Sequence, residues 1–221
     1  MRGFEPKAAW TAAALKVDSL DQRYIPTGVT AMPAGVYHSQ VVSAPPTNWL
    51  QLLQPQWPGA VGMNNPAVSG PNYAFVADMR QYLGGVSPGE SYFQQLKNNG
   101  LKTFSTAEPT LAALIQGQIK LALVPNSAGL GAAFQDSNLK LAYLDPVTLL
   151  PSVIGIDGKA SKQEQREAKA FGNFVFSAAG QHQRLIEDPH GDSPFWPAVK
   201  GSPQLSAVPP FSSIPYQVLN T

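Results

Sequence analysis

The sequence predicts an α/β fold, and three observations support this. Short apolar runs at 101–104, 119–124 and 139–144 have the length and composition of strands. An amphipathic run at 105–118, STAEPTLAALIQGQ, separates the first two and is typical of a helix. Strands that alternate with helices through short loops indicate an α/β layer with a largely parallel sheet. With 221 residues, 43% of them hydrophobic, the chain can form one large domain or two smaller ones.

The region before this unit predicts a series of short elements. They are a helix at 9–17, an extended segment at 27–38, a short helix within 45–59, a strand at 60–63 and helices at about 71–83 and 88–99. Pro33 places the extended segment at an edge or a crossover, because proline cannot donate to a sheet ladder. Thr47 or Asn48 can cap the short helix, which ends before Pro55.

The region after this unit predicts an extended apolar segment at 148–157, a long helix at 161–186 and a mostly irregular tail at 188–221. Ser161 and Glu164 have the spacing of a capping box at the start of the long helix. Its apolar positions recur at helical spacing, at Ala168, Phe171, Phe174 and Val175. We expect Gly180 to break or end this helix.

Composition excludes several classes of protein. Charged residues make up 13% of the chain, its net charge is +1 and it has no Lys/Arg run, which argues against a nucleic-acid partner. No stretch approaches the roughly 20 apolar residues of a membrane span. Residues 1–20 lack the pattern of a signal peptide, so we expect a cytoplasmic chain or a trimmed product. The absence of cysteine excludes disulfides, thiol catalysis and cysteine metal sites.

Two helix starts and one loop carry the candidate binding residues. The first start contains Ser69, Gly70 and Asn72, and the second contains Ser105 and Thr106. A helix N-terminus presents unpaired amides and a partial positive charge, which suit an anion. Ser69 can instead simply cap its own helix, and Glu108 can simply complement the dipole of the second helix.

The loop after the 119–124 strand contains the other two polar candidates. Asn126 and Ser127 can hydrogen-bond a polar solute, or Asn126 can be a turn residue after the strand.

No enzyme or metal motif is present. The sequence has no Gly-x-Ser-x-Gly elbow and no His-Glu-x-x-His, and GLGAAF at 129–134 has only two of the three dinucleotide glycines. Candidate carboxylates stand at strand or loop ends, at Asp136, Asp145 and Asp157. The histidines, His38, His182 and His190, lack the spacing of a zinc site. The sequence therefore predicts no catalytic residue, no metal site and no cofactor. The four tryptophans, Trp10, Trp49, Trp57 and Trp196, are interpreted as packing residues.

Three segments in order resemble the periplasmic solute-binding proteins of ABC transporters, in the iron(III)/phosphonate/polyamine-like group. They are PTNWLQLLQPQWPGAVGMNNPAVSG, TLAALIQGQIKLALV and SKQEQREAKAFGNFVFSAAGQ, and the resemblance runs from about Tyr24 to Gln181. It implies a type 2 periplasmic binding fold with two α/β lobes and a ligand cleft between them. Residues 27–38 and 148–157 would cross between the lobes. Residues 37–147 would form lobe two, and 1–36 with 148–221 would form lobe one.

Members of this group carry roughly 80–110 further residues before this point. We therefore expect lobe one to be incomplete at its N-terminus, in a truncated or processed chain or in one that borrows the missing part from another molecule. Exposed apolar surface of an incomplete lobe would favour a partner, including self-association. The resemblance also implies a periplasmic location and an inner-membrane ABC permease as partner.

The resemblance implies a small polar or anionic solute, such as a phosphonate or phosphate ester. Its contacts at the first helix start would be Ser69, Gly70 and Asn72. The remaining contacts would be Ser105 and Thr106 at the second helix start, Asn126 and Ser127 in the loop after the 119–124 strand, and Tyr37 at the end of the first crossing. Iron-binding members place two adjacent tyrosines where this chain has Asn126 and Ser127, so iron(III) is disfavoured. The alternatives are an effector-binding regulatory module of the same fold and an enzyme on this scaffold. The first normally follows a DNA-binding helix-turn-helix, and the second needs a nucleophile or acid–base pair; neither is found here.

Overall fold

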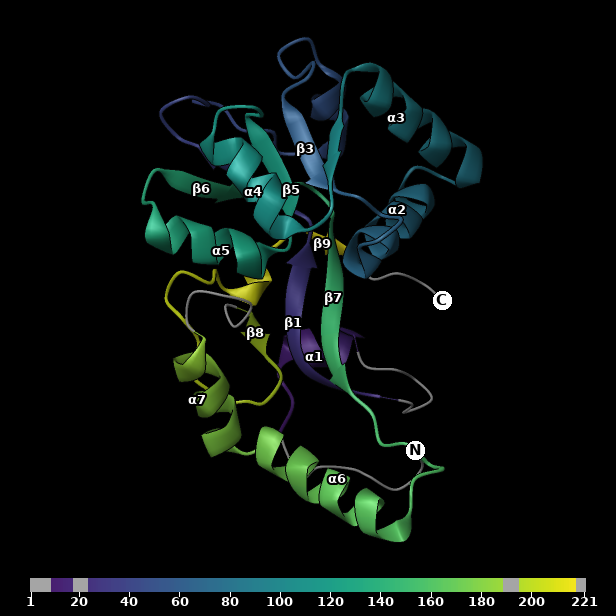
Figure 1. Cartoon of the computed structure of the whole chain (residues 1–221), viewed down its shortest axis with the longest axis vertical. Coiled ribbons are helices and arrows are strands. Elements are labelled where there is room, and N and C mark those ends of the chain that lie inside the picture. The colour runs from purple at the N-terminus through teal and green to yellow at the C-terminus, as the bar shows by residue number, and fades with distance from the viewer. Residues whose placement is uncertain (1–8, 18–23, 189–194, 218–221) are drawn as a thin grey trace.

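The chain forms two sheets that lie one above the other along the long axis of the molecule (Figure 1). The structure is a computed structural model that describes residues 9–17, 24–188 and 195–217. We call the five-stranded sheet with its helices lobe two, and the four-stranded sheet with its helices lobe one. The α/β class predicted from the sequence is confirmed.

Lobe two is built on a sheet in which four strands run in one direction and one runs against them. Its order is β4 (Lys102–Phe104), β3 (Val61–Asn64), β5 (Leu121–Val124), β2 (Ala34–His38) and β6 (Leu139–Ala142). Strand β3 pairs in parallel with β4 and β5, whereas β2 is antiparallel to both β5 and β6. The predicted parallel arrangement therefore holds except at β2, which enters the sheet from the opposite edge.

Helices cover both faces of this sheet. One face packs against η1 (Trp49–Leu53), α2 (Gly70–Tyr82) and α3 (Val86–Asn98), and the other against α4 (Ala107–Ile115) and α5 (Asn126–Gln135). Strand β5 shows both contacts, because Leu121 and Leu123 belong to one core and Ala122 and Val124 to the other. A strand buried on both faces needs a continuous apolar run, which the sequence has at this point.

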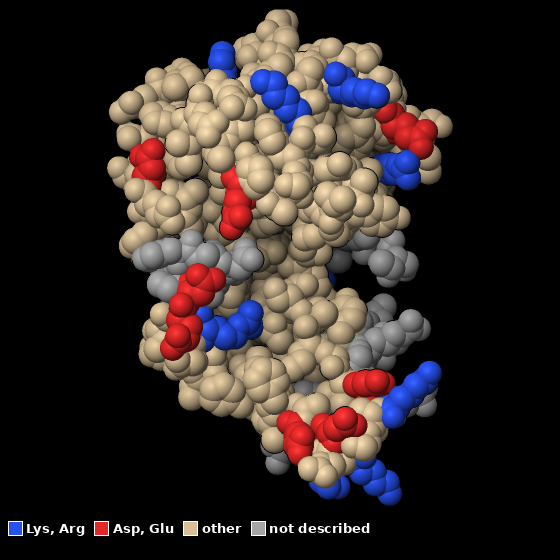
Figure 2. Space-filling view, viewed as in Figure 1, with Lys and Arg blue, Asp and Glu red and all other residues tan. Residues whose placement is uncertain are grey.

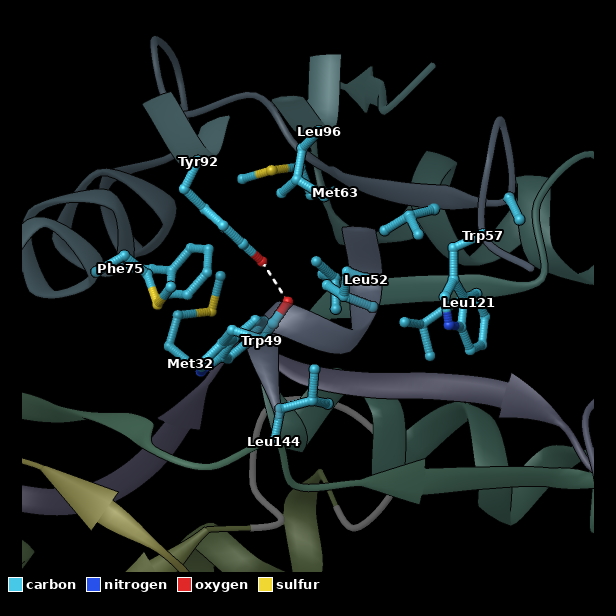
Figure 3. Close-up of a cluster of buried hydrophobic side chains, with 14 of the residues drawn as sticks. Met32, Trp49, Leu52, Trp57, Met63, Phe75, Tyr92, Leu96, Leu121 and Leu144 are labelled. Carbon is cyan, nitrogen blue, oxygen red and sulfur yellow. Dashed lines mark hydrogen bonds between the residues drawn. The ribbon is translucent and has the colours of Figure 1, made fainter. Parts of the chain in front are cut away.

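The larger core of lobe two is centred on Trp49, the first residue of η1 (Figure 3). The hydroxyl of Tyr92 donates a 2.8 Å hydrogen bond to the carbonyl oxygen of Trp49, which joins α3 to η1. Met32 and Leu144 belong to the same core, although each lies next to a crossing between the lobes. Of the two predicted caps for η1, Asn48 fills the role, since its side chain accepts from the amide of Gln51.

Lobe one is built on the sheet order β8 (Trp196–Pro197), β1 (Ile25–Met32), β7 (Val147–Ile154) and β9 (Tyr216–Gln217). Strands β1 and β7 are antiparallel over most of their length and run side by side along the molecule (Figure 1). Helix α1 (Ala12–Val17) and the short η2 (Phe211–Ser213) cover this sheet. Trp196 is 2% exposed in this core, so its interpretation as a packing residue is confirmed.

Two segments join the lobes. The chain leaves β1 and enters β2 through Pro33, and it leaves β6 and enters β7 through residues 143–146. The Met32–Pro33 and Asp145–Pro146 peptide bonds are both cis. Pro33 therefore stands at a crossover rather than inside a strand, as its missing donor predicts.

The predicted long helix at 161–186 is two helices, α6 (Lys162–Val175) and α7 (Ala178–Glu187). The capping box of Ser161 and Glu164 is confirmed, but the predicted break at Gly180 is wrong. The break lies at Phe176 and Ser177, and the Ser177 side chain caps α7 by accepting from the amide of Gly180. A Cβ atom at Gly180 would lie 2.0 Å from the Phe174 carbonyl oxygen, so glycine permits a tight connection between two helices.

The apolar positions of α6 do not face a core. Phe171 is 61% exposed and Phe174 is 50% exposed, and Val153 of β7 is also 50% exposed. These side chains line a groove of about 510 Å³ between α6, α7 and β7. The helix predicted from the spacing is present, but its apolar face is exposed to solvent.

Candidate functional site

The loops that follow β3, β4 and β5 meet at one edge of the lobe two sheet. Because these strands are parallel, their carboxyl ends share an edge, and each leads into a helix: α2, α4 or α5. Ala34, the first residue of β2, pairs with Val124 at the end of β5, so the first crossing arrives at the same edge. In open α/β sheets, ligands bind outside the carboxyl ends of the strands.

The three helices that begin at this edge have no side-chain cap. None of the residues at their N-cap positions, Ser69, Thr106 and Pro125, makes a side-chain capping bond. Of the other helices, η1, α6 and α7 are capped by the side chains of Asn48, Ser161 and Ser177, whereas α3, which follows Gly85, also lacks a side-chain cap. The first amides of a helix lack intrahelical acceptors. The edge between the lobes therefore gathers three helix starts whose donors suit an external acceptor.

The start of α2 contains an orphaned buried donor. The Ser69 hydroxyl donates to Oδ1 of Asn72 at 3.3 Å instead of capping the helix. Asn72 is 0% exposed, and its Nδ2 has no hydrogen-bond partner within residues 9–17, 24–188 and 195–217. Gly70 is exposed, and a Cβ there would contact nothing within 4 Å. The predicted trio thus lies together, but Gly70 is not required by close packing within the chain.

The start of α4 opens on a groove of about 770 Å³ that runs between α4 and α5. Thr106 lines this groove, while Ser105 is exposed beside it. The groove extends to Asp188 at the end of α7, so lobe one contributes to its wall. Glu108 and Asp188 are the charged residues among those described as lining it. Figure 2 shows acidic side chains on both sides of the lobe junction on this face, over α4 and at the upper end of α7.

Asn126 is engaged by the protein itself. Its side chain is 0% exposed, and its Oδ1 accepts a 2.9 Å hydrogen bond from the amide of Ala31 in β1. Its Nδ2 donates to the Tyr143 hydroxyl at 3.5 Å, and burial raises the pKa of that hydroxyl. Ser127 is 2% exposed. These two predicted ligand contacts therefore lie beneath the surface, and Asn126 joins lobe two to lobe one.

Tyr37 lies away from the other predicted residues. It pairs with Leu121 at the beginning of β5, whereas the helix starts follow the end of that strand. Tyr37 lies three positions after Ala34 along β2, which places it about 10 Å from the edge. Its partly buried side chain packs against the Trp49 core.

Two buried polar contacts near this edge were not predicted from the sequence. The Thr148 hydroxyl donates to Oδ2 of Asp78 at 2.5 Å, and the Thr110 hydroxyl donates to Oδ1 of Asn64 at 2.8 Å. The burial of Asp78 could have been predicted, because this residue lies in α2 beside the core residues Phe75 and Met79. A carboxylate among apolar helix positions indicates a buried partner.

Metal and membrane features are absent from the part of the chain that the structure describes. Among residues 9–17, 24–188 and 195–217, no three His, Asp or Glu side chains gather as a metal site would need. No described helix is both long and apolar enough to cross a bilayer. His190 lies outside the described residues.

Solved structures share this architecture, which is the type 2 periplasmic binding fold. Iron-bound HitA from Pseudomonas aeruginosa superposes with a TM-score of 0.77 at 21% identity, covering 92% of this chain and 67% of HitA. AfuA from Actinobacillus pleuropneumoniae, with fructose-6-phosphate bound, gives 0.74 at 15% identity, covering 97% and 69%. A periplasmic thiamin binding protein gives 0.69 at 18% identity, covering 97% and 66%. The chain spans about two thirds of the length of these proteins.

The family follows from the sequence. Residues 4–198 match the model of the bacterial extracellular solute-binding protein family, and the chain belongs to that family. No curated protein matches the sequence. Members of the family bind solutes and are not catalysts, so the prediction of a non-enzymatic binding protein is confirmed.

Proposed function

We propose that this chain acts as the solute-binding component of an ABC importer and holds a small polar solute with an anionic group between its lobes. The observation that carries the proposal is the orphaned Asn72 amide at the start of α2, beside two further uncapped helix starts. A buried donor without a partner costs free energy unless an acceptor reaches it. Asn72 is 0% exposed, so we propose that an oxygen of a phosphonate or phosphate ester provides that acceptor when the start of α2 opens toward the space between the lobes.

The proposed contacts are Ser69, Gly70 and Asn72 at one start and Ser105 and Thr106 at the other. Glu108 and Asp188 line the adjoining groove, so we propose that hydroxyl or amine groups of the solute point toward them. A second anionic group of the solute would be repelled at Glu108. Asn126 and Ser127 would support the site from beneath, and Tyr37 would contribute only through packing.

Solved structures with this fold bind solutes of different classes. One has fructose-6-phosphate bound, one has iron bound, and one is a thiamin binding protein. A sugar phosphate combines an anionic group, which suits the uncapped helix starts, with hydroxyls, which suit the acidic groove. Iron is disfavoured because ferric ion prefers anionic oxygen ligands, and Asn126 and Ser127 stand where iron-binding members are expected to have tyrosines.

The lobe division and the cellular role belong to the same proposal. The division expected from the sequence is 37–147 for lobe two and 1–36 with 148–221 for lobe one, and we propose it with lobe two beginning at Ala34, where β2 begins, and lobe one resuming at Val147, where β7 begins. The chain would act in the periplasm and deliver its solute to an inner-membrane ABC permease. An effector-binding module of the same fold is the alternative, and it would bind solute without a permease.

Isothermal titration with fructose-6-phosphate, methylphosphonate, inorganic phosphate, thiamin and ferric citrate tests the proposal. We expect heat of binding from a phosphate- or phosphonate-bearing compound and its loss in Asn72→Leu. Glu90→Gln is the matched control, because Glu90 pairs with Arg80 on the surface of α2 and α3. No binding by any compound, or equal binding by Asn72→Leu, would count against it.

We also propose self-association through the open face of α6. Phe171 and Phe174 are half or more exposed and line an apolar groove with Val153. Analytical ultracentrifugation should then detect dimers whose dissociation constant rises in Phe174→Lys. A monomer at all concentrations would exclude this part of the proposal.

A further inference from the structure

Asp78 is a buried carboxylate that forms no salt bridge with any residue that the structure describes. It is 0% exposed in α2, and its Oδ2 accepts a 2.5 Å hydrogen bond from the Thr148 hydroxyl. Its Oδ1 has no hydrogen-bond partner. An apolar pair at these positions would avoid the desolvation of a carboxylate, so stability alone does not explain this pair.

The Asp78 contact joins the two lobes. Helix α2 belongs to lobe two, whereas Thr148 is the second residue of β7, directly after the second crossing. The Gln217 side chain of β9 adds a 3.4 Å hydrogen bond to the Asp78 carbonyl oxygen. Helix α2 is thus bonded near its middle to two strands of lobe one.

The first crossing has a matching contact. There, the amide of Ala31 in β1 donates to Asn126, the first residue of α5. Strand β1 is therefore bonded to α5 and strand β7 to α2, in each case through one buried side chain of the helix. Both helices lack a side-chain cap at the N-terminus. The two contacts flank the edge on which the proposed solute site lies.

We infer that Asp78 is a positioning residue, which fixes the angle between the lobes and thereby the location of the α2 N-terminus. This inference rests on the proposed function, because it takes Ser69 and Asn72 as solute contacts. Asp78 lies nine positions after Ser69, which corresponds to about 14 Å along the helix. A rotation of α2 about Asp78 moves its start relative to lobe one. Apparent affinity then falls with the fraction of molecules that hold the competent arrangement.

The absence of cysteine makes this angle measurable. Cysteines introduced at the exposed positions Gln56 in lobe two and Lys169 in lobe one accept spin labels, and pulsed electron resonance gives their distance distribution. The full chain is compared with Thr148→Val, Thr148→Ser and Asp78→Leu in this background. Thr30→Val is the matched control, because the Thr30 hydroxyl bonds to Leu150 within the lobe one sheet.

We expect a shifted or broadened distribution in Thr148→Val and Asp78→Leu. Thr148→Ser keeps the hydroxyl and should retain the original distribution, as should Thr30→Val. Folded Thr148→Val or Asp78→Leu protein with the original distribution would overturn the inference. No solute is present in this experiment, so its failure leaves the proposed function untouched. That proposal fails instead if the unmodified chain binds none of the test compounds.

Discussion

The backbone amide of Ala31 donates a 2.9 Å hydrogen bond to the side-chain oxygen of Asn126, 95 positions away in the sequence. The bond connects the last part of β1 with the first residue of α5, and both groups are buried. It makes the loop after β5 a link between the lobes rather than an open polar surface. Asn126, which the sequence predicts as a solute contact, thus bonds the two lobes to each other.

Removing the side-chain amide of Asn126 should destabilise the protein. Asn126→Ala leaves the buried Ala31 N–H without an acceptor, which typically costs about 1–3 kcal/mol in the free energy of unfolding. Urea unfolding followed by tryptophan fluorescence measures the change. Asn98→Ala is the control, because Asn98 is exposed and should stay within about 0.5 kcal/mol. Equal stability of the two variants would contradict the assigned role.

A side chain at Gly180 should be strongly unfavourable. In Gly180→Ala the new Cβ would meet the Phe174 carbonyl oxygen at 2.0 Å, so the connection between α6 and α7 must shift. We expect a loss of about 2 kcal/mol or more. Gly158→Ala serves as control, since a Cβ there meets nothing within 4 Å. Thermal unfolding of both variants tests the prediction, and a Gly180→Ala protein as stable as the control would refute it.

The capping box of α6 should give a pH-dependent stability. Hydrogen bonds to the side chain and amide of Ser161 lower the pKa of Glu164 below its ordinary 4.5. A carboxylate whose folded pKa is depressed stabilises the fold above pH 4.5, and this contribution is lost as pH falls toward the folded pKa. Ser161→Ala should therefore be less stable than the parent at pH 7, with a smaller difference at pH 3. A pH-independent difference in urea midpoints would contradict this prediction.

Asn72→Leu should separate folding from binding. Its Nδ2 is buried without a partner, so a similarly sized apolar side chain removes a desolvated donor. The Ser69 hydroxyl loses its bond to Oδ1 of Asn72, but Ser69 is partly exposed and its hydroxyl can bond to water instead, so the free energy of unfolding should not fall. This is the opposite of the result expected for Asn126→Ala. Both variants can be compared in the same urea titration, and a strongly destabilised Asn72→Leu would show that Asn72 serves the fold.

Local pattern allowed much of the fold to be predicted from the sequence. The apolar run at 119–124 became the central strand β5, and Ser161 with Glu164 marked the start of α6. Gly180 misled because glycine serves both as a helix breaker and as a point of close approach, and only the position of Phe174 distinguishes the two. Periodicity located the apolar face of α6 but carries no information on what covers it.

The candidate site could be predicted only in part, because its decisive contacts are long-range. Ser69, Gly70 and Asn72 are close in sequence, and their shared helix start could be recognised. The partner of Asn126 lies in β1 and the partner of Asp78 lies in β7, so neither contact has a local signature. Tyr37 is three residues from the crossing, yet the direction of β2 carries it away from the edge.

Native mass spectrometry of the chain, after incubation with a bacterial small-molecule extract, tests the central claim most directly. The account predicts one small adduct per chain that is lost on denaturation and is absent from Asn72→Leu. Its mass would also indicate whether the solute carries phosphate or phosphonate. A folded chain that acquires no adduct, or an Asn72→Leu protein that acquires the same adduct to the same extent, would contradict a solute site at the start of α2.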